Sequence, residues 1–275
     1  MTASHSTNDG SPALARDEIV LTVAQGKRLI GMGVAALPVV RHALQSGVIG
    51  IARGSTNGYV AEAILGREID RPAFTTGLTL PAGRVPRELR DDREMGEIVI
   101  EKGVVVAGKT MAEAAKTMGP DDVLIKGANA LNYRQKVAGV LILHPTGGTL
   151  GGILGSVIGR RITLIIPVGL EKEIAYDILE ASRALERHKQ PAISLWPITG
   201  IIITEIEALK QLTGVDAIQI AAGGVAGAEG SIRLLIQGTG EQVKATLDLV
   251  QRLRGELPFE AVAEHAREIY GRGRV

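Results

Sequence analysis

Short apolar runs with the length of a buried strand recur along the first two thirds of the chain. They occupy residues 47–52, 123–125, 139–143 and 162–168. Three of the four are followed by a small or polar turn and then by apolar residues at helical spacing. This repeated order of strand, turn and helix predicts an α/β fold with a Rossmann-like, mostly parallel sheet over residues 17–190.

The pattern changes at about residue 191. The following elements are expected in the order strand, helix, strand, strand and helix, at 193–203, 204–212, 216–222, 231–238 and 240–254. This βαββα order is typical of a small ferredoxin-like α+β unit, which we predict over 191–257.

The segments at the two ends of the chain read differently from these units. Residues 1–16 are polar and Ser-rich, which predicts a disordered tail. Residues 17–46 are predicted to form a helical hairpin or one bent helix, with Pro38 at the bend. Residues 258–275 are predicted to form a C-terminal helix.

The strand at 47–52 leads into the first candidate site, at Arg53, Gly54, Ser55 and Thr56. The first amides of a helix have no partner inside the helix and lie at the positive end of its dipole, so this turn can bind a phosphate or carboxylate. Gly54 lets a ligand oxygen approach the backbone. Ser55 and Thr56 can contact such a ligand, or they can simply cap the helix.

A Thr-rich stretch at 71–81 adds Thr75 and Thr76 as possible ligand contacts at the end of a second strand. The alternative is that these two threonines only reflect strand propensity.

The strand at 123–125 delivers Lys126 and the small turn of Gly127, Ala128 and Asn129 to its carboxyl end. Open α/β sheets bind ligands at that end of their strands. A lysine there can neutralise a phosphate or a developing enolate oxygen. The alternative is a surface lysine beside a tight turn.

The strand at 139–143 is followed by a second potential anion loop, which contains Thr146, Gly147, Gly148 and Thr149. The loop is not a GxGxxG fingerprint, and no acidic residue follows at the usual distance, so a dinucleotide is not expected. His144 could serve as an acid or base, or it could be a packed, hydrogen-bonded residue.

Two carboxylates complete the set of candidate proton-transfer groups. Asp122 immediately precedes the strand that delivers Lys126. Glu171 follows the strand at 162–168, where it could face the ligand or could merely favour the positive end of a helix.

Composition narrows the class of function. The 275 residues carry 31 Lys and Arg against 30 Asp and Glu, a net charge of +1, and only 3% aromatic residues. Nucleic-acid binding usually needs a basic excess and aromatics for stacking, so it is not expected. The chain has no cysteine, which removes thiolate catalysis and Cys-ligated metals. We expect no metal and no cofactor.

The uncharged stretch at 137–159 is long enough to span a bilayer. Pro145 and the glycine pairs at 147–148 and 151–152 interrupt it, so a buried strand, a turn and a buried helix explain it better. No export signal is evident, and we expect a cytoplasmic protein without membrane contact. The aliphatic composition also favours a homo-oligomer.

Three segments together resemble a known family. They are Gly54-Ser55-Thr56, Thr75-Thr76 and Leu124-Ile-Lys-Gly-Ala-Asn-Ala-Leu-Asn-Tyr-Arg-Gln-Lys136. Over roughly residues 20–140 the chain resembles ribose-5-phosphate isomerase of the A type and, more broadly, the superfamily that joins it with glucosamine-6-phosphate deaminase and the CoA transferases. The resemblance implies that the Gly-Ser-Thr turn holds a sugar phosphate and that Lys126 and its turn line the reacting end.

The chain departs from that family at its catalytic glutamate, where it has Gln135. An amide cannot take a proton from a sugar carbon. The acidic segment that the isomerase carries before the lysine strand is also missing. The resemblance therefore supports the fold and the phosphate site and argues against ribose-5-phosphate isomerisation by the familiar mechanism.

The sequence predicts an enzyme that acts on a phosphorylated sugar or similar small phosphorylated metabolite, by aldose-ketose isomerisation or a related enolisation. Lys126 would stabilise the oxyanion, and Asp122, His144 or Glu171 would be the base. The first alternative is a metabolite sensor that keeps the phosphate pocket without catalysis. The second is a CoA-thioester enzyme whose two Gly-rich turns hold the nucleotide part.

Overall fold

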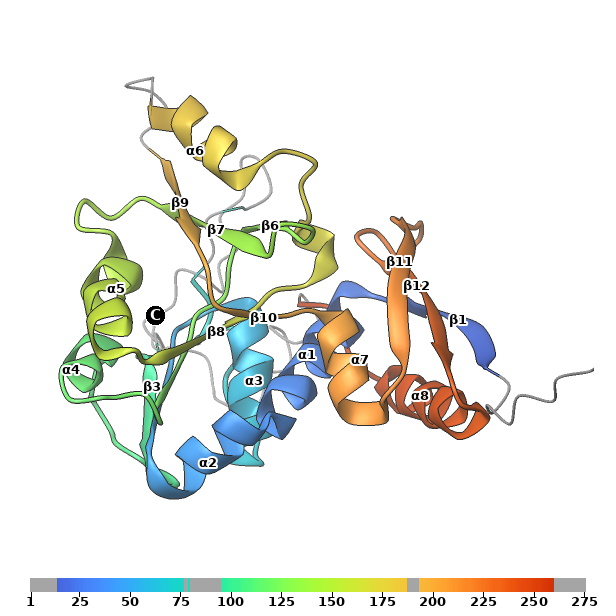
Figure 1. Ribbon diagram of the computed structural model, residues 1–275, viewed down its shortest axis with the longest axis horizontal. Helices are drawn as coiled ribbons and strands as arrows, with labels where there is room; N and C mark the ends of the chain where they lie inside the picture. The colour runs from blue at the N-terminus through green and yellow to red at the C-terminus, as the bar shows by residue number, and fades with distance from the viewer. Residues whose placement is uncertain (1–13, 77–78, 80–94, 187–192, 260–275) are drawn as a thin grey trace, which may run out of the picture.

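The computed structural model describes residues 14–76, 79, 95–186 and 193–259, and its main feature is a six-stranded sheet (Figure 1). The strand order is β10 (Ile201–Ile203), β8 (Thr163–Pro167), β5 (Val123–Ile125), β2 (Val48–Ile51), β3 (Ile98–Glu101) and β4 (Val104–Val105). The first four strands run parallel and the last two are antiparallel additions. The predicted α/β class with a mostly parallel sheet is confirmed.

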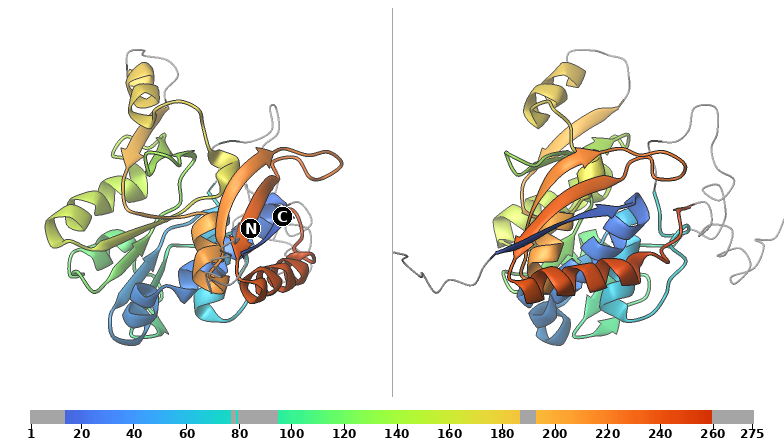
Figure 2. Two further views of the ribbon diagram at one scale, coloured as in Figure 1. Left: turned by 45° about the vertical axis from the view of Figure 1, so that its right-hand side comes forward. Right: turned by 90° about the vertical axis from the view of Figure 1, so that its right-hand side faces the viewer.

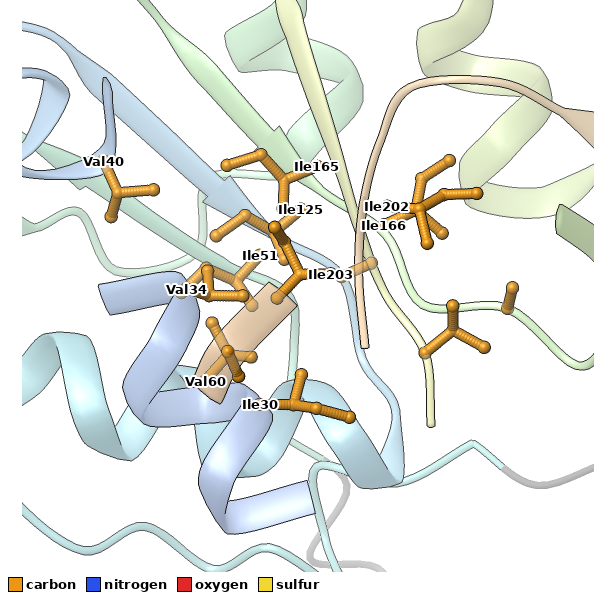
Figure 3. Packing of buried hydrophobic residues seen from close by; sticks show 14 of the residues in the cluster. Ile30, Val34, Val40, Ile51, Val60, Ile125, Ile165, Ile166, Ile202 and Ile203 are labelled. Carbon is orange, nitrogen blue, oxygen red and sulfur yellow. The ribbon is translucent and has the colours of Figure 1, made fainter. Parts of the chain in front are cut away.

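Helices cover both faces of this sheet. The elements α1 (Val23–Ala36) and α3 (Ser55–Leu65) lie on one face, where Ile51 of β2 meets Val34 and Val60 (Figure 3). The elements α4 (Met111–Ala115) and α5 (Gly148–Arg160) lie on the other face. A Cβ at Gly50 would come within 2.6 Å of Leu124 and 3.1 Å of Met111, so glycine at this position lets α4 approach the sheet.

The core is built from isoleucines at matching positions of neighbouring strands. Ile51 pairs in register with Ile125, which pairs with Ile165, and all three are fully buried. Their side chains gather beneath α1 and α3 (Figure 3). Because helices cover both faces, these strands carry apolar residues without alternation, which explains the continuous apolar runs in the sequence.

A second, antiparallel sheet consists of β6 (Ala130–Asn132), β7 (Val137–Ile142) and β9 (Ser194–Ile198), with α6 (Ile178–Glu186) packed against it. The strand predicted at 193–203 is therefore two strands, β9 and β10, in two different sheets. The chain turns between them at Gly200, where a Cβ would lie 2.6 Å from the carbonyl oxygen of Leu164.

The third sheet joins the two ends of the described chain. Its order is β1 (Ala15–Leu21), β12 (Ile232–Gly238) and β11 (Asp216–Ala222), and α7 (Glu205–Thr213) and α8 (Gly240–Leu253) complete this antiparallel unit. Figure 2 shows β1 alongside β12. The predictions of a tail ending at residue 16 and a helix starting at 17 are wrong here, since strand pairing with β12 takes these residues.

Other local predictions are confirmed. Helix α1 ends at Ala36 and α2 (Pro38–Ser46) begins at Pro38, the predicted bend. The stretch at 137–159 forms β7 and α5, and no helix of the described chain has the length and apolarity needed to cross a membrane. The predicted C-terminal helix and the first 13 residues of the predicted tail lie outside the described residues, apart from 258–259.

Candidate functional site

The carboxyl ends of the four parallel strands meet at one edge of the central sheet, and each leads to a polar or charged residue. Ser55 follows β2, Lys126 follows β5, Glu171 and Lys172 follow β8, and Glu205 follows β10. In open parallel sheets this edge is where ligands bind. The edge therefore carries the candidate site.

A cavity of about 530 Å³ includes Ser55 from this edge. Its walls are the first turns of α1 and α3, the loop around 227–229 and the segment at 254–259. Lys27, Arg71 and Thr75 add polar groups, while Tyr59 and Phe259 add apolar surface. A cavity of this size with a few convergent polar groups is suited to a small metabolite.

Lys27 lies on the wall of this cavity and donates a hydrogen bond from Nζ to Ser55 Oγ at 3.1 Å. Burial, with a smaller contribution from the charge of Lys172, lowers the pKa of the Lys27 ammonium to about 8. Glu171 and Glu205 oppose this shift. Lys27 therefore lies on the cavity wall and also interacts electrostatically with Lys172, Glu171 and Glu205.

Lys126 lies at the site, as the strand-end rule predicts. Its Nζ donates to the carbonyl oxygen of Gly127 at 3.1 Å. Burial lowers the pKa of Lys126 to about 8, with a contribution from Lys172, while Glu97 raises it. Near neutral pH this lysine can therefore exist with or without its proton.

Glu205 is the most deeply buried ionisable residue of the group, at 2% exposure. Burial raises the pKa of its carboxyl well above the usual range, and the Glu171 carboxylate raises it further. Glu205 Oε2 accepts a hydrogen bond from the amide of Leu170 at 3.0 Å. Oε1 of Glu171 is buried and has no hydrogen-bond partner among the described residues.

Two glycines make room for these carboxylates. A Cβ at Gly26 would lie 2.4 Å from Glu205 Oε1, and one at Gly169 would lie 1.7 Å from Glu171 Oε2. Since Gly26 immediately precedes Lys27, the Glu205 carboxylate lies against the same turn of α1 that carries the cavity lysine.

The N-terminus of α3 holds polar atoms that the protein itself does not satisfy. The helix has no side-chain cap. Thr56 Oγ1 and Asn57 Oδ1 are buried and have no hydrogen-bond partner in the part of the chain that is described. An unsatisfied buried polar atom costs about 1–3 kcal/mol, so native proteins keep few of them without a ligand or water. The Thr56 hydroxyl can donate to an anion and supports the predicted anion site at this turn, whereas Asn57 Oδ1 can only accept a hydrogen bond.

The second predicted turn is occupied by contacts within the protein. Thr149 Oγ1 donates to Glu97 Oε1 at 2.5 Å, and Thr146 Oγ1 lies 3.0 Å from His144 Nδ1. His144, Thr146 and Gly148 are exposed. Gly147 precedes α5 as its N-cap in the left-handed region, and a Cβ there would lie 2.7 Å from the Trp196 ring.

Arg53 interacts electrostatically with the Glu97 carboxylate, which also accepts the hydrogen bond from Thr149. Burial lowers the pKa of Arg53, and Glu97 opposes the shift. Glu97 also raises the pKa of Lys126. The second turn is therefore linked to Lys126 by the Glu97 carboxylate, which accepts a hydrogen bond from Thr149 of that turn.

Asp122 is not brought to the site. It precedes β5, at the opposite end of the strand from Lys126. Its carboxylate accepts hydrogen bonds from the amides of Val48 at 2.6 Å and Gly119 at 2.7 Å, which fixes the amino ends of two strands. The geometry gives Asp122 a structural position rather than that of a base.

The remaining predicted contacts divide between the cavity and the backbone. Thr75 lines the cavity but donates its hydroxyl to the Arg71 carbonyl at 2.8 Å, and Thr76 is exposed. Asn129 Oδ1 accepts from the amide of Leu141 at 3.0 Å, and the Ala128 carbonyl accepts from Lys172 Nζ at 3.1 Å.

Gln135, which the resemblance is expected to place at the position of a catalytic glutamate, is exposed. Its Nε2 donates to Asp177 Oδ2 at 2.7 Å in the β6–β7 turn region.

Sequence reasoning missed Lys27, Lys172 and Glu205. Glu205 could have been found by the rule that found Lys126, because it follows the apolar Ile201–Ile203 strand at its carboxyl end. Lys27 carries no local signal, since it lies on a helix and reaches the site only through the packing of α1 on α3.

Comparison of the chain with protein-family models, with curated proteins and with solved structures finds no match. Within the described ranges, no group of three or more His, Asp or Glu side chains is placed to hold a metal ion.

Proposed function

We propose that the protein is an enzyme that acts on a small phosphorylated metabolite of the sugar-phosphate class, by enolisation or aldose-ketose isomerisation. One observation carries the proposal. Lys27 lies on the cavity wall, hydrogen-bonded to Ser55, and interacts electrostatically with Glu171 and Glu205. A binding pocket and groups that exchange protons near neutral pH are thus adjacent.

The phosphate would bind at the N-terminus of α3. Its first amides and the Ser55 hydroxyl offer donors, and the positive end of the helix dipole favours an anion. Thr56 supplies a buried hydroxyl without a partner among the described residues. The reacting carbon of the sugar would then face the edge that carries Lys126.

The proposed chemistry needs a base with a pKa near the working pH and a cation beside the carbonyl oxygen. Glu171 and Glu205 supply the base, because burial and mutual repulsion raise the pKa of Glu205. Lys126 would supply the cation, with a pKa of about 8, from the same sheet edge, although it is not among the residues that line the cavity. Asp122 and His144 are left out of this role because of their positions.

The resemblance to the ribose-5-phosphate isomerase superfamily, with its Rossmann-like sheet and ferredoxin-like unit, is part of the same proposal. It is supported by the placement of Ser55 and Lys126 at one edge of a mostly parallel sheet. Gln135 carries an amide and is exposed, so Glu171 and Glu205 are proposed as the base in its place. A cytoplasmic homo-oligomer stays the expectation from sequence.

Binding is tested first, by thermal unfolding with sugar phosphates, inorganic phosphate, nucleotides and CoA esters. A ligand at about 100 times its dissociation constant adds about 2.7 kcal/mol. We expect Ser55→Asp to abolish stabilisation by a pentose or hexose phosphate. Thr146→Asp, which adds the same charge at the second turn, is the matched control and should leave it unchanged. Indifference of the wild-type protein to every sugar phosphate would contradict the proposal.

Catalysis is tested by exchange of carbon-bound hydrogen in the stabilising sugar phosphate for solvent deuterium, followed by NMR. We expect exchange with the wild-type protein and a loss of at least about 10²-fold with Glu205→Gln. Binding without exchange would identify the metabolite sensor instead. Stabilisation by CoA esters alone would favour the CoA-thioester enzyme.

A further inference from the structure

Lys27 lies on the cavity wall beside the Ser55 hydroxyl, without a carboxylate partner in the described chain. Its Nζ lies at the cavity wall near the N-terminal end of α1, and its only hydrogen-bond partner among the described residues is the Ser55 hydroxyl. No carboxylate forms an ion pair with it in the described chain, although Glu171 and Glu205 act on it electrostatically. A lysine meant only to hold a charge usually has such a partner.

Lysine becomes a nucleophile when it is desolvated or lies next to another cation. Lys27 meets both conditions, through its burial and through the nearby charge of Lys172. The Ser55 hydroxyl at 3.1 Å and the carboxyl of Glu205 beside Gly26 are available to relay protons at this point.

From this arrangement we propose that Lys27 forms a Schiff base with the carbonyl carbon of the bound metabolite. The proposal rests on the proposed function, since it takes the same cavity and the same class of substrate. It adds the covalent step that precedes proton transfer.

The step balances without any further reagent. The neutral Nζ attacks the carbonyl carbon, and a proton moves from nitrogen to oxygen to give a carbinolamine. Protonation of its hydroxyl and loss of one water give the protonated imine. The imine withdraws electrons from the neighbouring carbon, whose proton passes to the Glu171 and Glu205 pair. Loss of this proton leaves an enamine, and return of a proton from the same pair to the same carbon restores the imine. Hydration of the imine then releases the carbonyl compound and the free amine, so the step accounts for enolisation and hydrogen exchange and not for aldose-ketose isomerisation.

Lys126 is the competing nucleophile, because burial lowers its pKa to a similar value. It is not among the residues that line the cavity, and its Nζ donates to its own chain at the Gly127 carbonyl. Position on the cavity wall therefore selects Lys27.

The test is reductive trapping with sodium borohydride in the presence of ribose 5-phosphate or dihydroxyacetone phosphate, read by intact mass and peptide mapping. We expect one covalent adduct per chain, on Lys27. Glycerol 3-phosphate, which has no carbonyl group, should give none. Adducts spread over exposed lysines such as Lys210, or confined to Lys126, would overturn the proposal.

Variants separate the nucleophile from its charge. Lys27→Arg keeps a cation but cannot form the adduct, so trapping should be lost while thermal stabilisation by the sugar phosphate is retained. Lys210→Met, which removes an exposed lysine, should trap like the wild type. Lys172→Met removes the charge that lowers the pKa of Lys27, so the pH profile of trapping should move to higher pH. The proposal would be overturned if Lys172→Met left the pH profile of trapping unmoved and Lys27→Arg still trapped the substrate like the wild type.

The two proposals fail in different ways. Stabilisation by a sugar phosphate without trapping overturns the Schiff base and leaves the proposed function standing. If no sugar phosphate stabilises the protein, the proposed function fails, and trapping with glycolaldehyde, which carries no phosphate, still decides the role of Lys27. Faster trapping of glycolaldehyde on Lys27 than on Lys210 supports Lys27 as a nucleophile. Equal or slower trapping on Lys27 overturns that role.

Discussion

Glu205 Oε1 lies so close to Gly26 that a Cβ added there would come within 2.4 Å of it. Glu205 is the first residue of α7, which follows the parallel strand β10, and Gly26 belongs to the first turn of α1. Two helices that start at different sheets therefore meet at one ionisable group. This contact places a buried carboxyl directly behind the lysine on the cavity wall.

Gly26→Ala should disturb this contact. The new methyl group displaces a carboxylate that is buried and hydrogen-bonded to Leu170, and such overpacking costs about 1–3 kcal/mol. We expect the free energy of unfolding in urea to fall by that amount and proton exchange to fall with it. Gly155→Ala is the matched control, because a Cβ there would meet open space. Equal stability of the two variants would show that Glu205 moves aside freely.

Stability should depend on pH through Glu205. Its pKa is raised in the folded protein, so between the ordinary carboxyl pKa and the raised value the folded state holds more protons than the unfolded state. Stability is therefore lost as pH rises through this window, with a slope that approaches about 1.4 kcal/mol per pH unit. Glu205→Gln should remove this loss, so the variant gains stability relative to wild type as pH rises.

Thermal unfolding between pH 4 and pH 8 measures this effect. Glu241→Gln, at an exposed position in the first turn of α8, serves as the control and should follow the wild type. The lysines act in a separate window: their lowered pKa of about 8 makes stability rise with pH above that value. Parallel curves for Glu205→Gln and wild type would show that Glu205 titrates normally.

Lys126→Met should stabilise the protein while removing activity. Burial lowers the pKa of Lys126, which means that its charged form is held at a cost near neutral pH. An apolar side chain of similar length avoids that cost, and we expect a gain of about 0.5–2 kcal/mol in thermal or urea unfolding. Proton exchange into the sugar phosphate should be lost. A destabilised variant would indicate that the lysine serves the fold rather than a reaction.

Local rules predicted part of the site and could not predict the rest. Lys126 and the turn at Ser55 were found because a buried strand followed by a small turn is visible in ten residues of sequence. Lys27 was not, since it reaches the cavity only through packing of α1 on α3. The sequence predicts a tail and a helix where the structure has the strand Ala15–Leu21, because the strand's partner β12 lies more than 200 residues away. Neither relationship has a local signature.

The same limit applies to Asp122 and His144. Both stand next to strands, and the sequence shows only that proximity. The structure adds direction: Asp122 ties β5 to β2 at their amino ends, and His144 is exposed beside Thr146.

Glu256 holds the C-terminal segment over the cavity. Its carboxylate forms ion pairs with Arg28 at 2.5 Å and Arg71 at 3.7 Å, and both guanidinium groups lie over the Tyr59 ring. Glu256→Gln should weaken this anchor and raise the dissociation constant of the cavity ligand. Because the pair is mostly shielded from water, we expect a stability loss of about 1–3 kcal/mol.

Isothermal titration and urea unfolding measure the two effects at Glu256. Asp248→Asn breaks an exposed ion pair with Lys244 on α8 and is the control, with an expected change of at most about 0.5 kcal/mol. Unchanged ligand affinity in Glu256→Gln would mean that the segment lines the cavity without shaping it.

Thr56→Val tests whether the unsatisfied hydroxyl belongs to a ligand. The side chain is 3% exposed and its Oγ1 has no hydrogen-bond partner among the described residues, so without ligand the substitution removes a desolvated polar group and breaks no bond. We expect the stability of the free protein to stay the same or rise. Binding of the sugar phosphate should weaken by about 1–3 kcal/mol, roughly 5-fold to more than 100-fold.

Ser182→Ala is the matched control for Thr56→Val, since Ser182 is equally buried but donates to the Leu195 carbonyl at 2.6 Å. It should lose about 1 kcal/mol of stability and leave ligand binding unchanged. Loss of stability in Ser182→Ala and loss of ligand affinity in Thr56→Val would show that the Ser182 hydroxyl stabilises the fold and that the Thr56 hydroxyl binds the ligand. If Thr56→Val lost stability and kept full affinity, the N-terminus of α3 would have to be abandoned as the phosphate site.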